Sequence, residues 1–314
     1  MNKLEPKTVL IIDGNNMAYR AFYKFSQLST IDGKNTSITY GIPFIIKSLI
    51  EKLQPDMVVV VFDGSRSRHR LKLLPDYKGK RGNKLDFDKE DFNRQKGEVI
   101  KGLIAMGIPV ALNPKEEADD IIYMVLKVFL KQMIETIIIV SADKDFDQLA
   151  TKKNVIILNP GSGEKITVNN CIKLKGYEPK QTVDYLSLTG DTSDNIPGMP
   201  GVGDKRAIQF LSKYSTIRDY LKGTSPEEKL FPRKTLSEVY KRNSELIGLR
   251  RYYIKHMTKK TVNWVNNMPF PRFDVGEYKR YCIQNQLTSF NDKNFMQVFK
   301  SLNTRMFKMV NIKK

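Results

Sequence analysis

The sequence predicts an α/β fold with a mostly parallel central sheet and helices on both of its faces. Short runs of β-branched and other apolar residues recur at 9–12, 57–62 and 137–140, a composition typical of parallel strands buried on both faces. Between these runs lie longer stretches whose apolar residues recur at helical spacing. Each run is followed at once or after a few residues by an aspartate, namely Asp13, Asp63 and Asp143.

The expected elements alternate along the first half of the chain. Strands are predicted at 9–12, 57–62, 109–112, 137–140 and 154–158. Helices are predicted in a stretch that ends at 25, at 39–53, at 89–106, at 116–131, between the last two strands, and at 235–250. After Ile166 the chain is expected to be mainly helical, and the tail from 263 to 314 contains two basic helical stretches.

The charge balance indicates a polyanionic partner. The 314 residues include 53 Lys and Arg against 34 Asp and Glu, a net charge of +19, so nucleic acid is the simplest partner and an anionic membrane surface the competing one. No apolar run approaches the ~20 residues of a spanning helix, and the N-terminus lacks an apolar signal block. Cys171 and Cys282 suggest neither zinc nor a disulfide framework. We therefore expect a soluble intracellular protein.

Nine acids recur where strands end or helices begin. A single aspartate at such a place is often a helix cap. Here the pattern repeats, with Asp143 and Asp145 two residues apart, and Asp191 and Asp194 three apart. Carboxylates gathered at the edge of a parallel sheet suit a hard divalent cation such as Mg²⁺. The nine are Asp13, Asp63, Glu117, Asp119, Asp120, Asp143, Asp145, Asp191 and Asp194.

A basic segment from 65 to 81 directly follows the second strand and its aspartate. A run of this kind is usually a solvated surface. Because the segment lies beside Asp63 and contains Tyr77, we expect it to be a mobile basic segment that covers the acidic site. Its bases are Arg66, Arg68, Arg70, Lys72, Lys78, Lys80 and Arg81.

A glycine-rich turn, G-M-P-G-V-G-D-K-R-A at 198–207, stands before a basic helix. Backbone N–H groups at such a turn can receive a phosphate, and Lys205 and Arg206 add positive charge there. An ordinary packing turn is the alternative. The sequence offers no Ser/His/Asp or Cys/His set for nucleophilic catalysis, and His69 and His256 are predicted to be surface or packing residues.

An acidic pocket inside a basic protein suits metal-dependent cleavage of a phosphodiester. At these residues the chain resembles the flap endonuclease family, the 5′-nucleases of bacteriophages and of bacterial repair polymerases. The matching segments are I-I-D-G-N-N (11–16), V-F-D-G (61–64), L-L-P-D-Y-K-G-K-R (73–81), E-A-D-D (117–120), S-A-D-K-D (141–145) and G-D-T-S-D-N-I-P-G-M-P-G-V-G (190–203).

The resemblance implies a PIN-like core, a helical arch and a helix–three-turn–helix region that binds DNA. It implies a structure-specific 5′-nuclease, acting as a 5′-3′ exonuclease and flap endonuclease in DNA replication or repair, with two Mg²⁺ ions for which Mn²⁺ can substitute. The first ion would be held by Asp13, Asp63, Glu117 and Asp119, with Asp120 acting through water. The second would be held by Asp143, Asp145, Asp191 and Asp194. One departure is Asn15-Asn16, where a small hydroxyl residue is frequent, and we expect little effect.

By the same resemblance, Lys78 and Arg81 would steer the scissile phosphate, and Tyr77 would stack on the extruded nucleotide. The turn at 198–203 would clamp the duplex backbone with the help of K⁺. The DNA-binding residues implied are Gly198, Gly201, Val202, Gly203, Lys205, Arg206, Arg66, Arg68, Arg70 and Lys80.

Three parts are expected: a nuclease core at 1–188 that includes a basic arch at about 65–106, a duplex-binding region at 189–262, and a helical extension at 263–314. The expected partners are DNA with 5′ flaps, nicks or single-stranded 5′ ends, and RNA–DNA primers. We expect a monomer without membrane contact, in the cytoplasm of a bacterial or phage-infected cell. The alternatives are a PIN-type RNA nuclease, which would be shorter and lack the glycine turn, and a catalytically weak DNA-binding paralogue, which should have lost some of the nine acids.

Overall fold

The structure, a computed structural model, describes residues 7–79, 88–132, 134–226 and 228–311. Its centre is a six-stranded sheet in the order β3-β2-β1-β4-β5-β6, in which β6 alone among the described strands of the sheet runs antiparallel to its neighbour. The strands are β1 (Thr8–Asp13), β2 (Met57–Phe62), β3 (Val110–Leu112), β4 (Thr136–Val140), β5 (Val155–Leu158) and β6 (Lys165–Ile166). The predicted mostly parallel α/β fold and its five strands are confirmed.

The central strands form because their side chains are buried on both faces. Every residue of β2 is buried, as are Val9–Ile12 of β1 and Ile137–Val140 of β4. In the parallel register, Ile12 pairs with Val60 on one side and with Val140 on the other. The carboxyl ends of these three strands therefore lie at one edge of the sheet.

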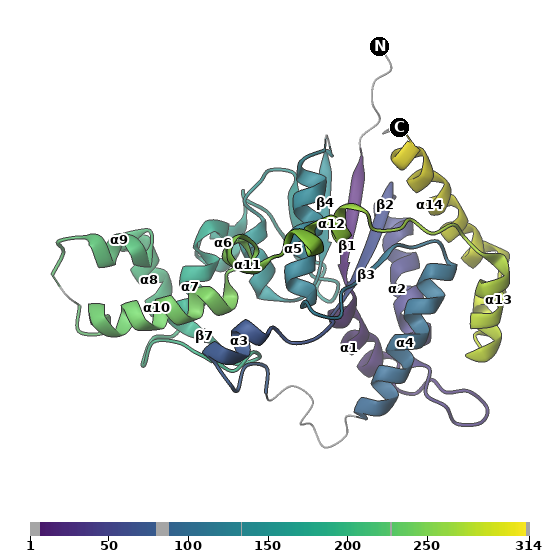
Figure 1. The fold of residues 1–314 in the computed structure, drawn as a ribbon, viewed down its shortest axis with the longest axis horizontal. Coiled ribbons are helices and arrows are strands. Elements are labelled where there is room, and N and C mark those ends of the chain that lie inside the picture. The colour runs from purple at the N-terminus through teal and green to yellow at the C-terminus, as the bar shows by residue number, and fades with distance from the viewer. Residues whose placement is uncertain (1–6, 80–87, 133, 227, 312–314) are drawn as a thin grey trace, which may run out of the picture.

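Helices cover both faces. Figure 1 shows α5 (Ala118–Leu130) on one side of the strands, and α1 (Gly14–Lys24), α2 (Ser37–Leu53) and α4 (Lys89–Ala105) on the other. The apolar residues at helical spacing that predicted α2 include Ile42, Ile46 and Ile50, all of them buried. The helices predicted at these places are confirmed, with ends that differ by a few residues.

Three local features differ from the prediction. The helix expected between β4 and β5 is a short 3-10 helix, η1 (Lys144–Leu149). The helix expected at 235–250 is two helices, α10 (Arg233–Ile247) and α11 (Leu249–His256), divided at Gly248, where a Cβ would lie 2.6 Å from the carbonyl oxygen of Ser244. A two-stranded hairpin, β7 (Gly190–Asp191) and β8 (Ile196–Pro197), was not predicted, because two-residue strands show no periodicity.

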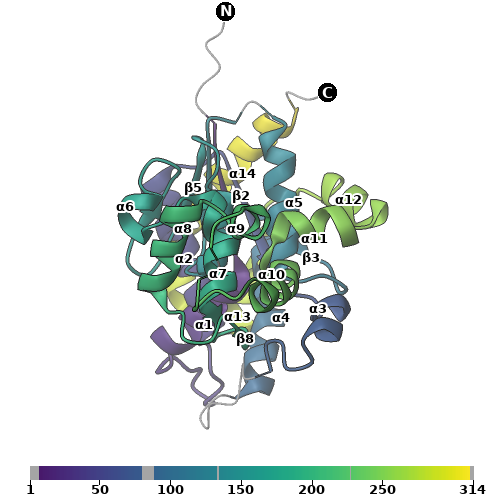
Figure 2. The ribbon, with the colours of Figure 1, turned by 90° about the vertical axis from the view of Figure 1, so that its left-hand side faces the viewer.

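The remaining elements extend the core at two opposite ends. Figure 1 shows α8 (Asp204–Tyr214), α9 (Ile217–Lys222) and α10 at one end, and α13 (Val275–Gln284) and α14 (Lys293–Asn311) at the other. Figure 2, viewed from the α8–α10 end, shows α7 and α10 in front of the core. The other short elements are α3 (Arg68–Leu73), α6 (Cys171–Lys175), η2 (Pro179–Gln181), α7 (Thr182–Thr189), α12 (Lys259–Asn266) and η3 (Thr288–Asn291).

The tail returns to the core. Helix α14 packs against α2 and β2, and α13 packs against α4. The hydroxyl of Tyr281 on α13 also donates to the carbonyl oxygen of Thr39 on α2. The division of the chain at residues 188 and 262 stays a prediction. Among the described helices, none combines the length and apolar character needed to cross a membrane.

Candidate active site

Three of the nine acids follow parallel strands at the same sheet edge. Asp13 ends β1, Asp63 comes directly after β2, and Asp143 comes three residues after β4. Asp13 and Asp143 also begin the next element, since the Asp13 carboxylate accepts from the backbone N–H of Asn16 and the Asp143 carboxylate from that of Asp145. The capping role and the place in the acidic site therefore coexist in the same side chains.

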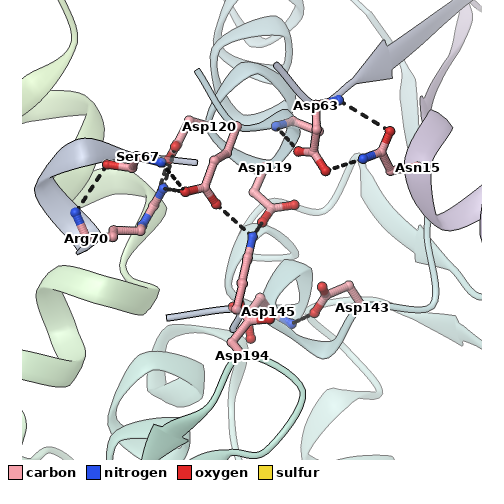
Figure 3. Close-up of polar contacts among 12 residues, drawn as sticks. Asn15, Asp63, Ser67, Arg70, Asp119, Asp120, Asp143, Asp145 and Asp194 are labelled. Carbon is pink, nitrogen blue, oxygen red and sulfur yellow. Dashed lines mark hydrogen bonds and ion pairs between the residues drawn. The ribbon is translucent and has the colours of Figure 1, made fainter. Parts of the chain in front are cut away.

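The other acids arrive from two further elements. Glu117 is the N-cap residue of α5, and Asp119 and Asp120 lie in its first turn. Asp191 belongs to β7, and Asp194 lies in the turn between β7 and β8. Figure 3 shows Asp119 between Asp63 and Asp120, with Asp143, Asp145 and Asp194 facing it from below.

The carboxylates of Asp145, Asp191 and Asp194 converge. One oxygen from each lies within 4.8 Å of the others, and all three residues are buried. The Oδ1 atom of Asp145 is buried and accepts no hydrogen bond from any described residue. Burial, followed by the charges of Asp143, Asp194 and Asp191, raises the pKa of Asp145 well above its usual range. Oxygen ligands in this state fit a divalent cation, which would supply the missing positive charge.

The acids of the predicted first metal group are engaged with protein donors. Asp13 accepts from the hydroxyl of Ser141 at 2.8 Å, and Asp63 accepts from the backbone N–H of Ala118 at 2.7 Å and from the Asn15 amide. Glu117 accepts from the Ser67 backbone N–H and from the Lys78 ammonium, both at 2.7 Å.

Burial and charge divide the acids electrostatically. Burial, with the charge of Asp119, raises the pKa of Asp13 to about 7, and the same two causes raise that of Asp143 to about 7. Burial alone would also raise the pKa of Glu117, but the charges of Lys78 and Arg70 lower it to about 2. The carboxyl groups of Asp13 and Asp143 therefore titrate near neutral pH, whereas the carboxyl group of Glu117 is ionised there.

Lys78 lies at the centre of the cluster. Its ammonium is 2.7 Å from Glu117 Oε2, 3.3 Å from Asp119 Oδ2 and 3.8 Å from Asp194 Oδ2, and the residue is 5 % exposed. Its backbone N–H donates to the carbonyl oxygen of Asp194, and its φ of +53° is unusual for a residue other than glycine. These carboxylates raise the pKa of Lys78 well above its usual range, although burial opposes them. The sequence predicted Lys78 near the reacting phosphate, and the structure places it among the acids of both proposed metal groups.

The structure corrects the prediction that Arg70 binds DNA. Arg70 is 1 % exposed, and its guanidinium donates to both carboxylate oxygens of Asp120, at 2.6 and 2.8 Å, and to the carbonyl oxygen of Leu246. The predicted role of Asp120 as a metal ligand through water stays a prediction, and both of its carboxylate oxygens accept from Arg70. Burial raises the pKa of Asp120 to about 6 against the opposing charge of Arg70. This ion pair joins α3 to α5 and is structural.

Tyr77 is also buried, so the prediction that it stacks on a nucleotide is wrong for this conformation. Its ring packs with Leu186, Ile196 and Leu246, and its hydroxyl donates to Glu117 Oε2 at 3.0 Å. Arg66 and Arg68 are exposed, as a DNA contact requires. Lys80 and Arg81 lie outside the described residues.

The glycine turn is partly packed and partly open. Val202 is buried in the core, and its backbone N–H donates to the carbonyl oxygen of Met199, so neither group is available to DNA, and that prediction is corrected. Gly198 lies against the backbone at the end of α7, where a Cβ would be 2.4 Å from the Leu188 carbonyl oxygen. Of the residues predicted to bind DNA here, Gly201, Gly203, Lys205 and Arg206 are exposed, and so are Pro200 and the acidic Asp204 beside them.

A cleft of about 260 Å³ borders the cluster on the side of α4. Asp63 and Glu117 contribute acids to its lining. Four bases surround them: Arg66, Lys78, Lys89 and Lys96. An acidic floor with basic walls is suited to a phosphodiester, because the walls attract the strand and the acids can hold cations beside it.

Several supporting residues were not predicted. Ser141 holds Asp13, Ser67 holds Glu117, Lys96 donates to the carbonyl oxygen of Asp63, and Lys144 lies 3.5 Å from Asp191. Ser141 and Lys144 belong to the S-A-D-K-D segment, so their closeness in sequence was a usable signal. No sequence signal pointed to Ser67 or Lys96, because their partners are 50 and 33 residues away along the chain.

Two family models match the chain in succession. The model described as the 5′-3′ exonuclease N-terminal resolvase-like domain matches residues 8–179, and that of the 5′-3′ exonuclease C-terminal SAM fold matches 177–260. The 5′-3′ exonuclease of Aquifex aeolicus is 39% identical over 228 residues, which are 72% of this chain and 76% of the relative. That of Buchnera aphidicola is 34% identical over 70% of this chain and 75% of its own length.

A longer relative and two solved structures extend the likeness. The thermostable DNA polymerase I of Thermus filiformis is 35% identical over 69% of this chain but only 25% of the polymerase. Bacteriophage T5 5′-exonuclease with bound zinc ions has a TM-score of 0.67 at 20% identity, over 90% of this chain and 99% of that one. The catalytic core of Rad2 with a DNA substrate has a TM-score of 0.58 at 17% identity, over 95% and 92%. Together with the acidic cluster, these matches show that the chain belongs to the 5′-3′ exonuclease family.

Proposed function

We propose that the chain hydrolyses phosphodiesters near 5′ ends, flaps and nicks of DNA with two Mg²⁺ ions. The observation that carries this proposal is the convergence of Asp145, Asp191 and Asp194, with a buried Asp145 oxygen that accepts no bond from the described residues. Carboxylate oxygens favour Mg²⁺ and Mn²⁺ over softer ions.

Asp145, Asp191 and Asp194, with Asp143 beside them, would hold one ion. Asp13, Asp63, Asp119 and Glu117 would hold the other after Lys78 has released Glu117. Bound there, the ions would activate a water molecule and stabilise the charge on the leaving oxygen.

The protein's own groups would position the strand. The basic walls of the cleft, Arg66, Lys89 and Lys96, would attract the phosphates. Once released from the carboxylates, the Lys78 ammonium would be free to face the scissile phosphate, where it would favour the transition state more than the bound substrate. Ser141 would keep the Asp13 carboxylate oriented through their hydrogen bond.

The duplex would be bound away from this centre. Gly201, Gly203 and Lys205, which are exposed at the start of α8, would contact the phosphate backbone there. A K⁺ ion at this turn, acceptance of RNA–DNA primers, a monomeric state and a place in the cytoplasm belong to the same proposal. A role in replication or repair is supported by the polymerase relatives.

The test is cleavage of 5′-labelled flap, nicked and RNA-primed duplexes, each with Mg²⁺, Mn²⁺, Ca²⁺ or chelator. We expect short 5′ products from flaps and nicks in Mg²⁺ and Mn²⁺, and intact substrate in Ca²⁺ and chelator. Cleavage that persists in chelator would contradict the proposal. Flap and nicked duplexes that both stay intact in Mg²⁺ would contradict the substrate class.

A further inference from the structure

The only two histidines of the chain meet a glutamate away from the acidic site. His69 lies on α3, Glu245 on α10, and His256 is the last residue of α11. The Nε2 atom of His69 is 3.8 Å, and that of His256 3.7 Å, from Oε2 of Glu245. The two imidazole rings lie 3.8 Å apart, centre to centre. Helix α3 and the consecutive helices α10 and α11, which are distant from α3 in sequence, thus present two nitrogens and one oxygen to one point.

These three atoms are buried without a hydrogen-bond partner among the described residues. Separations of 3.7 and 3.8 Å are too long for hydrogen bonds between them. Leaving a buried polar atom unpaired costs about 1–3 kcal/mol, so three at one point call for a partner. The side chains themselves are 31, 12 and 27 % exposed, which leaves a path from solvent.

The geometry fits a cation with nitrogen and oxygen ligands. The three ligand atoms all lie within 4.8 Å of one another. Around a tetrahedral Zn²⁺ with bond lengths of about 2.1 Å, ligand atoms lie roughly 3.4 Å apart. The two distances from Glu245 Oε2 to the imidazole nitrogens, 3.8 and 3.7 Å, exceed this value by only a few tenths of an ångström. Two imidazoles and one carboxylate, with a fourth position open to water, are a known zinc ligand set, whereas Mg²⁺ prefers oxygen ligands alone.

The surroundings prepare the ligands for this role. The other oxygen of Glu245 lies 3.0 Å from Nε of Arg251 in an ion pair and accepts a hydrogen bond from Lys255, which leaves Oε2 for the imidazoles as outer-shell partners do. Burial and the neighbouring His256 lower the pKa of His69, which favours the neutral imidazole that a metal ligand requires.

We propose that His69, Glu245 and His256 form a binding site for Zn²⁺ or a similar late first-row divalent cation, separate from the nuclease centre. The ion would join α3 to the α10–α11 pair. Because α3 leads directly to Tyr77 and Lys78, the ion would fix the segment that carries the Lys78 ammonium into the acidic cluster.

The test uses the full chain in excess Mg²⁺, so that the carboxylate cluster is already filled. Co²⁺ is titrated and followed by visible absorption, which is stronger for a four-coordinate site with nitrogen ligands than for an octahedral oxygen site. Zn²⁺ is titrated by calorimetry. We expect one equivalent of each to bind with a nitrogen-ligand spectrum, and Zn²⁺ to raise the melting temperature.

His69→Ala and His256→Ala should each weaken this binding by more than the ~10–100-fold that loss of an outer-shell partner costs. Glu238→Gln, which changes an exposed residue of α10 outside the three ligands, is the control and should bind normally. His256→Gln keeps a polar side chain and serves if the alanine variants do not fold, as judged by circular dichroism. Wild-type protein that shows only an oxygen-ligand spectrum, or binding that survives both histidine variants, would overturn the proposal. Neither result depends on nuclease activity.

Discussion

Lys78→Met tests whether the Lys78 ammonium takes the place of divalent cations in the acidic cluster. The change keeps much of the side-chain volume but leaves Glu117, Asp119 and Asp194 without their shared counterion, which lies 2.7, 3.3 and 3.8 Å from them. Removing one partner of a buried ion pair typically costs about 3–5 kcal/mol. We expect a loss of that size in the free energy of unfolding in chelator, and a loss of about 1 kcal/mol or less in saturating Mg²⁺, because the ions replace the missing charge.

The assay is urea unfolding of both proteins in chelator and in Mg²⁺, followed by circular dichroism. Lys144→Met is the matched control, since Lys144 also lies near an acid, Asp191 at 3.5 Å, but is 45 % exposed. Its loss should stay below about 1 kcal/mol in either condition. If Lys78→Met lowers the free energy of unfolding equally with and without Mg²⁺, the cations do not replace the charge of the Lys78 ammonium. Our account of Lys78 would then be wrong.

Three further predictions follow from the charges. First, the pKa values of Asp13 and Asp143 are raised from 3.8 to about 7, so the stability they contribute is complete below the lower value and is lost as pH rises through the upper one. The melting temperature in chelator should therefore fall from about pH 5 to about pH 8 and fall much less in Mg²⁺; a flat profile in chelator would contradict these shifts. Second, Arg70→Met should lower the free energy of unfolding by about 3–5 kcal/mol, because Asp120 stays buried without its partner. Arg68→Met should instead weaken flap binding and leave the unfolding curve unchanged. The reverse pattern would show that Arg70 contacts DNA. Third, flap affinity in Ca²⁺ should fall steeply as salt rises, because bound lysines and arginines release counterions from DNA, and a flat response would exclude the basic surface from binding.

The sheet and the acids at its edge could be predicted because their signal is local. A parallel strand buried on both faces must be a short apolar run, and a strand order that follows βαβ units brings Asp13, Asp63 and Asp143 to one edge. The same logic placed Glu117 and Asp119 at the start of a helix. Even the capping alternative was partly correct, since Asp13 and Asp143 do cap the elements that follow them.

Which side chains of the basic segment are buried could not be predicted, because a run of lysines and arginines has the same sequence pattern whether it is solvated or buried. The buried Arg70 is paired with an aspartate 50 residues away along the chain, and the buried Lys78 is paired with acids 39 to 116 residues away. His69 and His256 posed the same difficulty, since their meeting with Glu245 depends on how α3 packs against α10 and α11. Periodicity describes which residues face a core and carries no information on which distant partner they meet.

The claim that the acidic cluster cleaves DNA with two ions is tested most directly by single-turnover flap cleavage at limiting Mg²⁺, in wild type and in Asp145→Asn. We expect the wild-type rate to rise with about the second power of the Mg²⁺ concentration. Asp145→Asn should lower the rate by roughly 10²-fold or more while its flap affinity in Ca²⁺ stays near that of wild type. A first-power dependence, or a variant that loses rate and affinity by equal factors, would contradict the account.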